Sequence, residues 1–371
     1  MNALTIVMAC FAVIGAIDRM IGNRFGIGRE FERGFMMLGA FALCMIGMIV
    51  MSPMIAYCLD PVLTLVAKYL PIDPSSFTAL IFPNDLGGAH LAVEVGRDAN
   101  VALFNAMITS AMFAVTVAYT VPVSMELCDH KQMKDVFLGF LCGIVTVPIG
   151  SLLGGLLGGL SFGTTLLNLI PQIIFTVIIA VCLLKFPEKC LKVFGAFGNG
   201  IRVVVTAGLA LGVFLQLTGL AFPLPLGTFA EGAVIVFNSG AVLCGAFPLV
   251  FFVSRVFRRP LHALGSRLGI NDVAATGLIS SLASSTTTFV MMSSMDRRGV
   301  VYNAAFAVSG AFTFGGHLAF TLVFAPDWLM PMIVSKLVAA LLSLPVAMLI
   351  FNFTLRREAK AWHLPHERSI I

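Results

Sequence analysis

One short stretch of this chain combines a carboxylate with a broken, apolar backbone. Between Ala79 and Val93 the sequence is apolar enough for lipid, but Pro83 interrupts a helix and Asp85 adds a negative charge. A carboxylate at bilayer depth costs roughly 2.5–3.5 kcal/mol, so such a group normally faces a pathway or a partner. Irregular backbone at that depth also requires cover by protein or by a watery cavity. These features are typical of the substrate site of a transporter.

Within this stretch, Asn84 and Asp85 would form a tip, and Gly87 and Gly88 would allow the close approach of a backbone or a ligand. An amine substrate would need an anion, and Asp85 is the only acid within an apolar run of the first half of the chain. We therefore expect Asp85 to contact a substrate or an ion. The alternative is that it caps the returning half-helix or pairs with His90.

A second apolar stretch, 273–295, contains no charge but many hydroxyl groups. Consecutive serines and threonines are poor helix interior because their hydroxyls compete for backbone hydrogen bonds. We predict a tip that offers oxygens to a hydroxyl or a cation, with ordinary helix bridging by small polar residues as the alternative. The candidate substrate-binding residues in this stretch are Ser284, Ser285, Thr286 and Thr287.

The helices that follow the two stretches carry further polar residues. Asn105 in the first matches Asn303 in the second. Ser309, Thr313 and His317 follow at four-residue steps, which would place them on one face of a helix. Because a polar face in an apolar helix points to the bundle interior, all five are candidate substrate-binding residues. The two asparagines could equally serve to join helices.

Three other charged residues have simpler explanations. Asp98 and Asp296 stand at helix starts and are predicted to be N-caps. Lys336 lies about one turn inside the end of an apolar helix, and we expect its ammonium group to extend out to the membrane surface. The sequence has no nucleotide-binding loop, metal-ligand spacing or nucleophile triad. We therefore predict a protein that is not an enzyme and that uses no metal and no cofactor.

The composition indicates a membrane protein. Charged residues make up 11% and hydrophobic residues 59% of the chain, against about 25% charged residues in soluble domains. Several apolar runs reach the ~20 residues that cross a bilayer. The net charge of +5 does not indicate a nucleic-acid partner, because the basic residues lie in short loops. We expect an all-α polytopic membrane protein whose partners are the lipid bilayer and a small-molecule substrate.

The two halves of the chain match at a nearly constant offset, which indicates an internal repeat. The offset stays between 197 and 199 for the pairs Asp73 and Asp272, Asn105 and Asn303, and Pro148 and Pro345. We predict a first repeat at 1–160 with a hairpin at 74–95, a linker helix and cytoplasmic connection at 161–198, a second repeat at 199–355 with a hairpin at 273–295, and a cytoplasmic tail at 356–371.

The positions of lysine and arginine predict how the repeats face. If each hairpin enters and leaves the membrane on one side, the cytoplasmic loops hold 20 of the 23 lysines and arginines, and only Lys68 and Arg97 lie outside. If every segment spans, the two sides hold equal numbers, against the positive-inside rule. We therefore predict an inverted-topology repeat of about nine transmembrane helices and two re-entrant hairpins. The N-terminus would be outside, the C-terminus cytoplasmic and the substrate site near the midplane.

Five segments of the chain form a recognisable set: Phe31–Ala40, Asp85–Gly88, Gly143–Gly150, Val308–Phe312 and His317–Thr321. With this set the chain resembles, over nearly its whole length, the ethanolamine-utilisation permease family, EutH. The resemblance implies a protein of the bacterial inner membrane that passes ethanolamine into the cell. Ethanolamine is a small cation with one hydroxyl group, which a carboxylate and a hydroxyl-rich hairpin would complement.

Two positions depart from the usual family pattern, as in a divergent member. Ser284–Thr288 stand where the family usually has an Asn/Pro-containing tip, and Gly316 stands where an acid usually precedes the histidine.

Three functions remain open on the sequence alone. The first is a permease or facilitator for ethanolamine or a similar amino alcohol, with Asp85 at the ammonium group and 284–288 at the hydroxyl. The second is an ion-coupled transporter of a small organic anion, held by hydroxyls and half-helix N-termini. The third is a non-transporting membrane receptor or scaffold. The fold type is compatible with a homodimer.

Overall fold

The computed structural model describes residues 3–256, 265 and 267–362, and these residues form helices and turns without a strand. Seven helical segments are long and apolar enough to cross a membrane: Ile27–Val66, Ala99–Leu127, Met133–Leu157, Phe162–Lys185, Lys192–Thr218, Phe229–Val253 and Pro326–Arg357. The predicted all-α class is therefore confirmed for the described residues. Their helix lengths and composition support a multi-pass membrane protein.

Two of the nine predicted spans are not among these seven. The first of them forms α1 (Ala3–Met20), which has 18 residues. The other, 300–325, is broken between α15 (Arg297–Gly310) and α16 (Gly316–Phe324). Phe312 has a φ of 61° in the break, a left-handed conformation in which an α-helix cannot continue.

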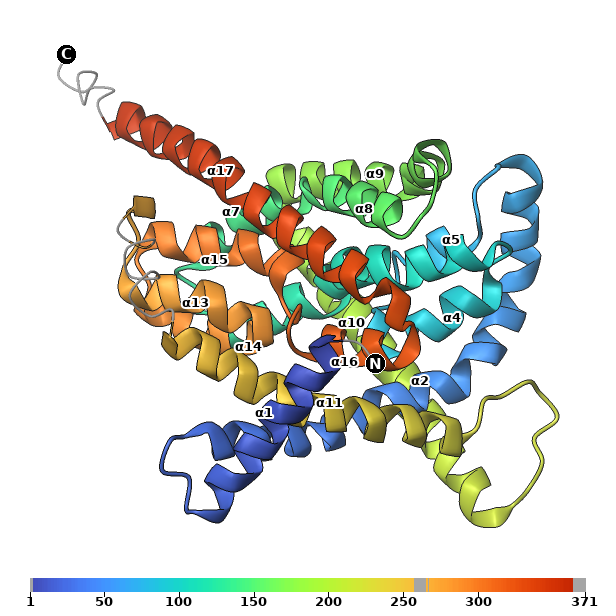
Figure 1. Cartoon of the computed structure of the whole chain (residues 1–371). Helices are drawn as coiled ribbons and strands as arrows, with labels where there is room; N and C mark the ends of the chain where they lie inside the picture. The colour runs from blue at the N-terminus through green and yellow to red at the C-terminus, as the bar shows by residue number, and fades with distance from the viewer. Residues whose placement is uncertain (1–2, 257–264, 266, 363–371) are drawn as a thin grey trace.

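The long helices form two groups of neighbours (Figure 1). One group contains α1, α2 (Ile27–Tyr69), α10 (Pro187–Thr218) and α11 (Phe229–Val256). The other contains α7 (Met133–Ile144), α8 (Val147–Leu157), α9 (Phe162–Lys185), α15 and α17 (Leu329–Trp362), packed around the segment 99–127. In Figure 1, α1, α11 and the first part of α2 lie in the lower part of the view, the later part of α2 rises along the right-hand side, and α7, α8, α9 and α15 lie above α1 and α11.

The segment 99–127 is one continuous but irregular helix. It consists of α5 (Ala99–Phe104), η2 (Asn105–Ala114), η3 (Thr116–Thr120) and α6 (Val121–Leu127). Both η2 and η3 have the wider π-helical winding, and every residue of η2 is buried. Such winding is frequent at functional sites, because it loosens the regular hydrogen-bond ladder.

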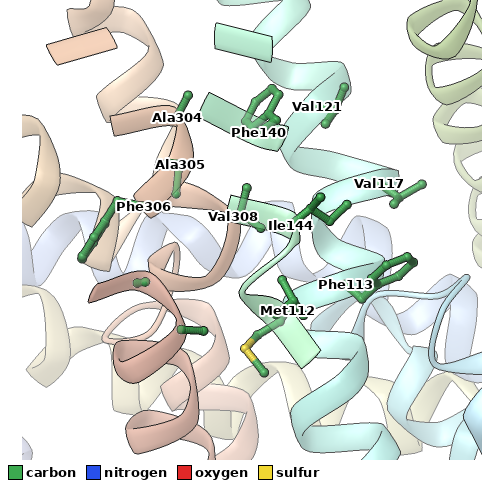
Figure 2. Close-up of a cluster of buried hydrophobic side chains, with 14 of the residues drawn as sticks. Met112, Phe113, Val117, Val121, Phe140, Ile144, Ala304, Ala305, Phe306 and Val308 are labelled. Atoms are coloured by element: carbon green, nitrogen blue, oxygen red, sulfur yellow. The ribbon is translucent and has the colours of Figure 1, made fainter. Parts of the chain in front are cut away.

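The apolar core lies where segment 99–127 meets α7 and α15, as Figure 2 shows. Its side chains include Met112, Phe113, Val117, Val121, Phe140, Ile144, Ala304, Ala305, Phe306 and Val308. Gly143 brings the backbones of α7 and α15 close together, because a Cβ there would overlap the carbonyl of Ala305. A hydroxyl adds a polar tie, since Thr116 Oγ1 donates to the Val308 carbonyl at 3.0 Å.

Two helix–turn–helix segments contact both groups of helices. The first contains α3 (Ser75–Thr78), η1 (Asn84–Leu86) and α4 (Gly88–Val95). The second contains α13 (Asp272–Ala283), α14 (Ser285–Met291) and η4 (Met292–Ser294). Below, 73–98 is called the first hairpin and 271–296 the second.

Hydrogen bonds join the two ends of each hairpin. In the first, the Asp73 carboxylate accepts from the backbone N–H groups of Arg97 and Asp98, at 2.9 and 3.0 Å. In the second, the backbone N–H of Asn271 donates to the Asp296 carboxylate at 2.8 Å. Each segment therefore begins and ends at one place.

The two predicted N-caps are confirmed. The Asp98 side chain accepts from the backbone N–H groups of Asn100 and Val101, and the Asp296 side chain accepts from that of Gly299. Both carboxylates therefore satisfy helix N-terminal donors that would otherwise lack partners.

Candidate substrate site

The tip of the first hairpin is a tight turn that buries Asp85. Pro83 leaves the preceding segment with an extended ψ of 143°, and Gly87 has a φ of 89°, a conformation that favours glycine. A Cβ at Gly87 would also overlap the side chain of Met48 in α2. The turn is thus fixed both by its own backbone and by α2.

Two more predicted residues belong to the same turn. A Cβ at Gly88 would overlap the carbonyl of Phe82, so the glycine permits the chain to fold back on itself. Asn84 is fully buried, and its side-chain amide has no hydrogen-bond partner within the described part of the chain.

Asp85 faces two groups from the C-terminal part of the chain. Its Oδ2 lies 3.7 Å from Nε2 of His317. Its carboxylate also interacts electrostatically with the ammonium group of Lys336. The structure thus pairs Asp85 with His317 rather than with His90, whose ring instead packs edge-on against Phe324 with centroids 4.7 Å apart.

Lys336 overturns one sequence-based expectation. Its side chain does not extend outward but is fully buried, and Nζ donates to the Ala111 carbonyl at 2.8 Å. Although Lys336 is only seven residues beyond the start of α17 at Leu329, other helices cover that part of α17. Position along a helix is therefore a poor measure of depth where neighbouring helices enclose its end.

The tip of the second hairpin is at Ser284, between α13 and α14. Ser284 is extended, with φ −161° and ψ 123°, and the residues after it form the first turn of α14 rather than a longer loop. Ser285 is fully buried, and its hydroxyl has no partner among the described residues.

The next two hydroxyls of this tip contact other helices. Thr286 Oγ1 lies 3.4 Å from the hydroxyl of Tyr119 in η3. Thr287 Oγ1 accepts from Arg33 Nη2 at 3.2 Å. The predicted helix-bridging role therefore describes both of these threonines.

A cavity of about 120 Å³ lies between the two tips. Asp85 lines it from the first hairpin, Ser284 from the second and Gly316 from α16. Its wall also includes the aromatic side chains of Phe41, Tyr119, Phe247 and Phe312. A carboxylate within a mostly apolar wall that includes aromatic rings is suited to an organic cation, which gains from both the charge and the ring faces.

A wider pocket adjoins this cavity. It has a volume of about 520 Å³ and shares Cys44, Leu86 and Tyr119 with the cavity. Farther along the pocket lie Glu126 and Arg202, whose charged groups are 4.0 Å apart. The pocket therefore adjoins the cavity and extends along α6 and α10.

Asn105 and Asn303 each hold a hairpin against the helix that follows it. Nδ2 of Asn105 donates to the hydroxyls of Ser75 and Ser76 at 2.9 Å each. Nδ2 of Asn303 donates to the Ala274 carbonyl at 2.9 Å. The structure therefore places both asparagines against the hairpins, outside the wall of the cavity.

The prediction that Ser309, Thr313 and His317 share one helix face is wrong. The helix stops after Ser309 and restarts just before His317, with Thr313 in the break. Thr313 Oγ1 donates to the Gly310 carbonyl at 2.7 Å, and the buried Ser309 hydroxyl has no partner in the described residues.

The break contacts the second hairpin through the backbone. The N–H of Phe312 donates to the Ser281 carbonyl at 3.1 Å, and the N–H of Phe314 donates to the Leu282 carbonyl at 2.8 Å. Of the three residues predicted to share a face, His317 is the one that the structure brings to Asp85.

Sequence reasoning missed Lys336 and the aromatic wall. Like Asp85, Lys336 is a charged residue inside an apolar run. Because it lies near a helix end, we expected its ammonium group to extend out to the membrane surface. Aromatic residues within apolar runs carry no signal of this kind, because core packing uses the same residues.

The apolar helices, the helix breaks and the buried ionisable groups of Asp85, His317 and Lys336 define the chain as a polytopic helical protein with a transporter-like site. The family model for "Ethanolamine utilisation protein, EutH" matches residues 1–350, and the chain belongs to this family. The predicted family is therefore confirmed. No solved structure matches the chain.

Curated relatives match the chain over most of its length. A Listeria monocytogenes protein named "Probable ethanolamine permease EutH" is 40% identical, with 94% of each chain covered. An Escherichia coli protein of the same name is 34% identical over 93% of this chain and 94% of its own. A Bacillus subtilis protein named "Uncharacterized protein YxeR" is 33% identical over 91% of each chain.

Proposed function

We propose that this chain is a secondary permease that moves ethanolamine across a bacterial inner membrane, with its substrate in the cavity between the two hairpin tips. The observation that carries the proposal is the buried Asp85 carboxylate in a mostly apolar cavity whose wall includes aromatic rings. Membership of the EutH family, whose relatives are named ethanolamine permeases, supports it.

The size of the cavity fits ethanolamine. A cavity of about 150 Å³ holds benzene, which has six carbon atoms. A cavity of about 120 Å³ therefore suits a molecule of four or five non-hydrogen atoms, and ethanolamine has four. Larger amino alcohols would require the wall to open.

The groups in the wall also fit. The ammonium group of ethanolamine would lie at Asp85, where charge-assisted hydrogen bonds are strong because little water competes. The aromatic faces of Tyr119 and Phe312 would add cation–π attraction. The hydroxyl would face Ser284 across the cavity. Arg33 also lines the cavity, but its charge is paired with Glu30 at 3.4 Å, which leaves Asp85 as the stronger determinant of substrate charge.

Reciprocal contacts between α2 and α11 support a twofold-related repeat. A Cβ at Gly34 of α2 would lie 2.7 Å from the Leu243 carbonyl oxygen and Cys244 N, and a Cβ at Gly232 of α11 would lie 2.9 Å from Ile46 Cα. Gly34 corresponds to Gly232, and Ile46 to Cys244, at the offset of 198. Such reciprocity is the property of a twofold axis.

The direction of these contacts supports inversion. The start of α2 meets the later part of α11 and the reverse, so the two helices run antiparallel. If both cross the bilayer, a twofold axis relating them lies in the membrane plane, as in inverted repeats. The joined ends of each hairpin support entry and exit on one side of the membrane, and hence a re-entrant path.

The proposal is tested by uptake of labelled ethanolamine into proteoliposomes that contain the purified chain. We expect saturable uptake that ethylamine inhibits, because it keeps the ammonium group and is no larger. Ethylene glycol and glycolate should not inhibit, since the first lacks the cation and the second carries the opposite charge.

The other outcomes distinguish the alternatives. Inhibition by glycolate but not by ethylamine would favour a transporter of organic anions. Absence of uptake by protein that is folded, as judged by a cooperative thermal transition, would contradict the ethanolamine assignment.

A further inference from the structure

Lys336 is a buried cation that takes no part in the substrate contacts proposed for ethanolamine. Its side chain is 0% exposed, and its one hydrogen bond is to the Ala111 carbonyl in the π-wound helix η2. It is absent from the wall of the cavity. A buried charge of this kind is costly unless a counter-charge accompanies it.

Asp85 is that counter-charge. The Asp85 carboxylate, on η1, interacts electrostatically with the Lys336 ammonium group, and the ring of His317, on α16, lies near both. The three groups come from three separate elements and are buried together.

The other elements packed on this part of α17 contribute uncharged contacts. Gly150 and Gly154 of α8 pack against Ser335, and Gly310 of α15 packs against Ala340. Farther along α7 and α15, the ionised groups of Asp135 and Arg297 pair with each other at 2.9 Å. Among the described residues, Asp85 is therefore the anion that interacts with the ammonium group of Lys336.

Resting on the proposed function, we propose that Lys336 is a resident cation that the substrate ammonium replaces as the partner of Asp85, and that this replacement releases one proton. Binding of ethanolamine would place two cations beside one buried carboxylate. The cost of that arrangement falls if one cation becomes neutral. Lysine can do so because its ammonium group loses a proton readily when burial or a like charge disfavours it.

The step is balanced. One N–H bond of the Lys336 ammonium group breaks, the electron pair stays on Nζ, and the proton passes to water. The neutral amine keeps its hydrogen bond to the Ala111 carbonyl, while the charge of the site is unchanged. Inward movement of one ethanolamine cation would thus be linked to outward movement of one proton.

The test is isothermal titration of the purified protein with ethanolamine in buffers of different ionisation enthalpy, which counts the protons released on binding. Over the pH range in which Lys336 of the free protein is protonated, we expect the wild type to release about one proton per ethanolamine and its affinity to rise about tenfold per pH unit. Lys336→Arg should bind ethanolamine without releasing a proton, because arginine does not dissociate and still accompanies the buried Asp85 carboxylate. Lys336→Met leaves that carboxylate without a cation, so Asp85 itself would hold a proton and release it on binding. Lys68→Met, at an exposed lysine of α2, is the matched control and should behave as the wild type.

The variants separate the proposal from a structural role. Because its arginine stays charged beside the bound ammonium group, we expect Lys336→Arg to bind ethanolamine more weakly than the wild type at every pH. Wild-type affinity of folded Lys336→Arg would show that the charge at 336 only holds Asp85 in place, and would overturn the proposal. So would release of a proton when ethanolamine binds to Lys336→Arg.

The wild-type measurement tests the proposal without any variant. Ethanolamine binding with no proton release would overturn the role of Lys336 alone and leave the proposed substrate intact. No ethanolamine binding by folded protein would contradict the proposed function and, with it, the role of Lys336.

Discussion

Gly316 is the residue at which the cavity has least room beside Asp85. A Cβ there would lie 2.9 Å from Phe41 Cζ and 3.0 Å from Asp85 Oδ2. We predict that Gly316→Ala weakens ethanolamine binding by about tenfold or more, because overpacking costs typically 1–3 kcal/mol and 1.4 kcal/mol is a factor of ten. Calorimetric titration would measure this loss.

Gly39→Ala is the matched control for this change. Gly39 lies in α2, two residues from Phe41, and a Cβ there would have no heavy atom within 4 Å. We expect its affinity for ethanolamine to equal that of the wild type. Equal affinity of the Gly316→Ala variant would contradict the place assigned to the substrate.

At the residue scale, the sequence predicted that Asp85 lies at the tip of a hairpin and that Asp98 and Asp296 are N-caps. These predictions were possible because charged and helix-breaking residues in apolar runs have few explanations. It did not predict the partners of Asp85. His90 was the nearer histidine in sequence, but α4 turns it toward Phe324, while the break before α16 brings His317 to Asp85. Such pairings depend on tertiary packing, which a single sequence does not specify.

The hairpins depend on asparagine ties to neighbouring helices. We predict that Asn105→Ala destabilises the protein by about 1–3 kcal/mol, because the hydroxyls of Ser75 and Ser76 lose their buried donor. Thermal unfolding in detergent would measure this. Asn100→Ala, at an exposed position of the same helix, should change stability by less than about 0.5 kcal/mol. Equal stability of both variants would contradict the role assigned to Asn105.

The connection between the cavity and the adjoining pocket can be tested with a native thiol. Cys44 lines both the cavity and the adjoining pocket, so a molecule in the cavity should block its reaction. In a chain whose other cysteines are replaced by serine, we predict that ethanolamine slows the labelling of Cys44 by a cationic methanethiosulfonate. The control is a second chain that keeps Cys58, exposed on the same helix, as its one cysteine, and Cys58 should react at an unchanged rate. Unprotected labelling of Cys44 at saturating ethanolamine would place the substrate elsewhere.

At the element scale, length and hydropathy predicted the long helices well but not the interruption of 300–325. Four-residue spacing from Ser309 to His317 predicted a continuous polar face, whereas Phe312 turns left-handed and its backbone bonds to the second hairpin. The hairpin supplies the acceptors that make the break possible, and those acceptors lie outside the helix itself.

For the whole molecule, the proposed inverted arrangement predicts which loops lie on the same side of the membrane. In cysteine-free chains carrying Lys68→Cys, Arg97→Cys or Lys131→Cys, we expect an impermeant thiol reagent to reach positions 68 and 97 from the outside and 131 from the cytoplasm. The reason is that the first hairpin returns to its starting side, as the Asp73 bonds indicate. Labelling of 68 and 97 from opposite sides would mean that the hairpin spans the bilayer.

The central claim is that Asp85 holds the ammonium group of ethanolamine, and ethanolamine uptake by Asp85→Asn tests it most directly. Asp60→Asn, at an exposed aspartate on α2, is the control. A charge-assisted hydrogen bond contributes about 1.5–3 kcal/mol, so we predict that initial uptake at low substrate falls at least about tenfold in Asp85→Asn and is unchanged in Asp60→Asn. Wild-type uptake by folded Asp85→Asn would contradict the account.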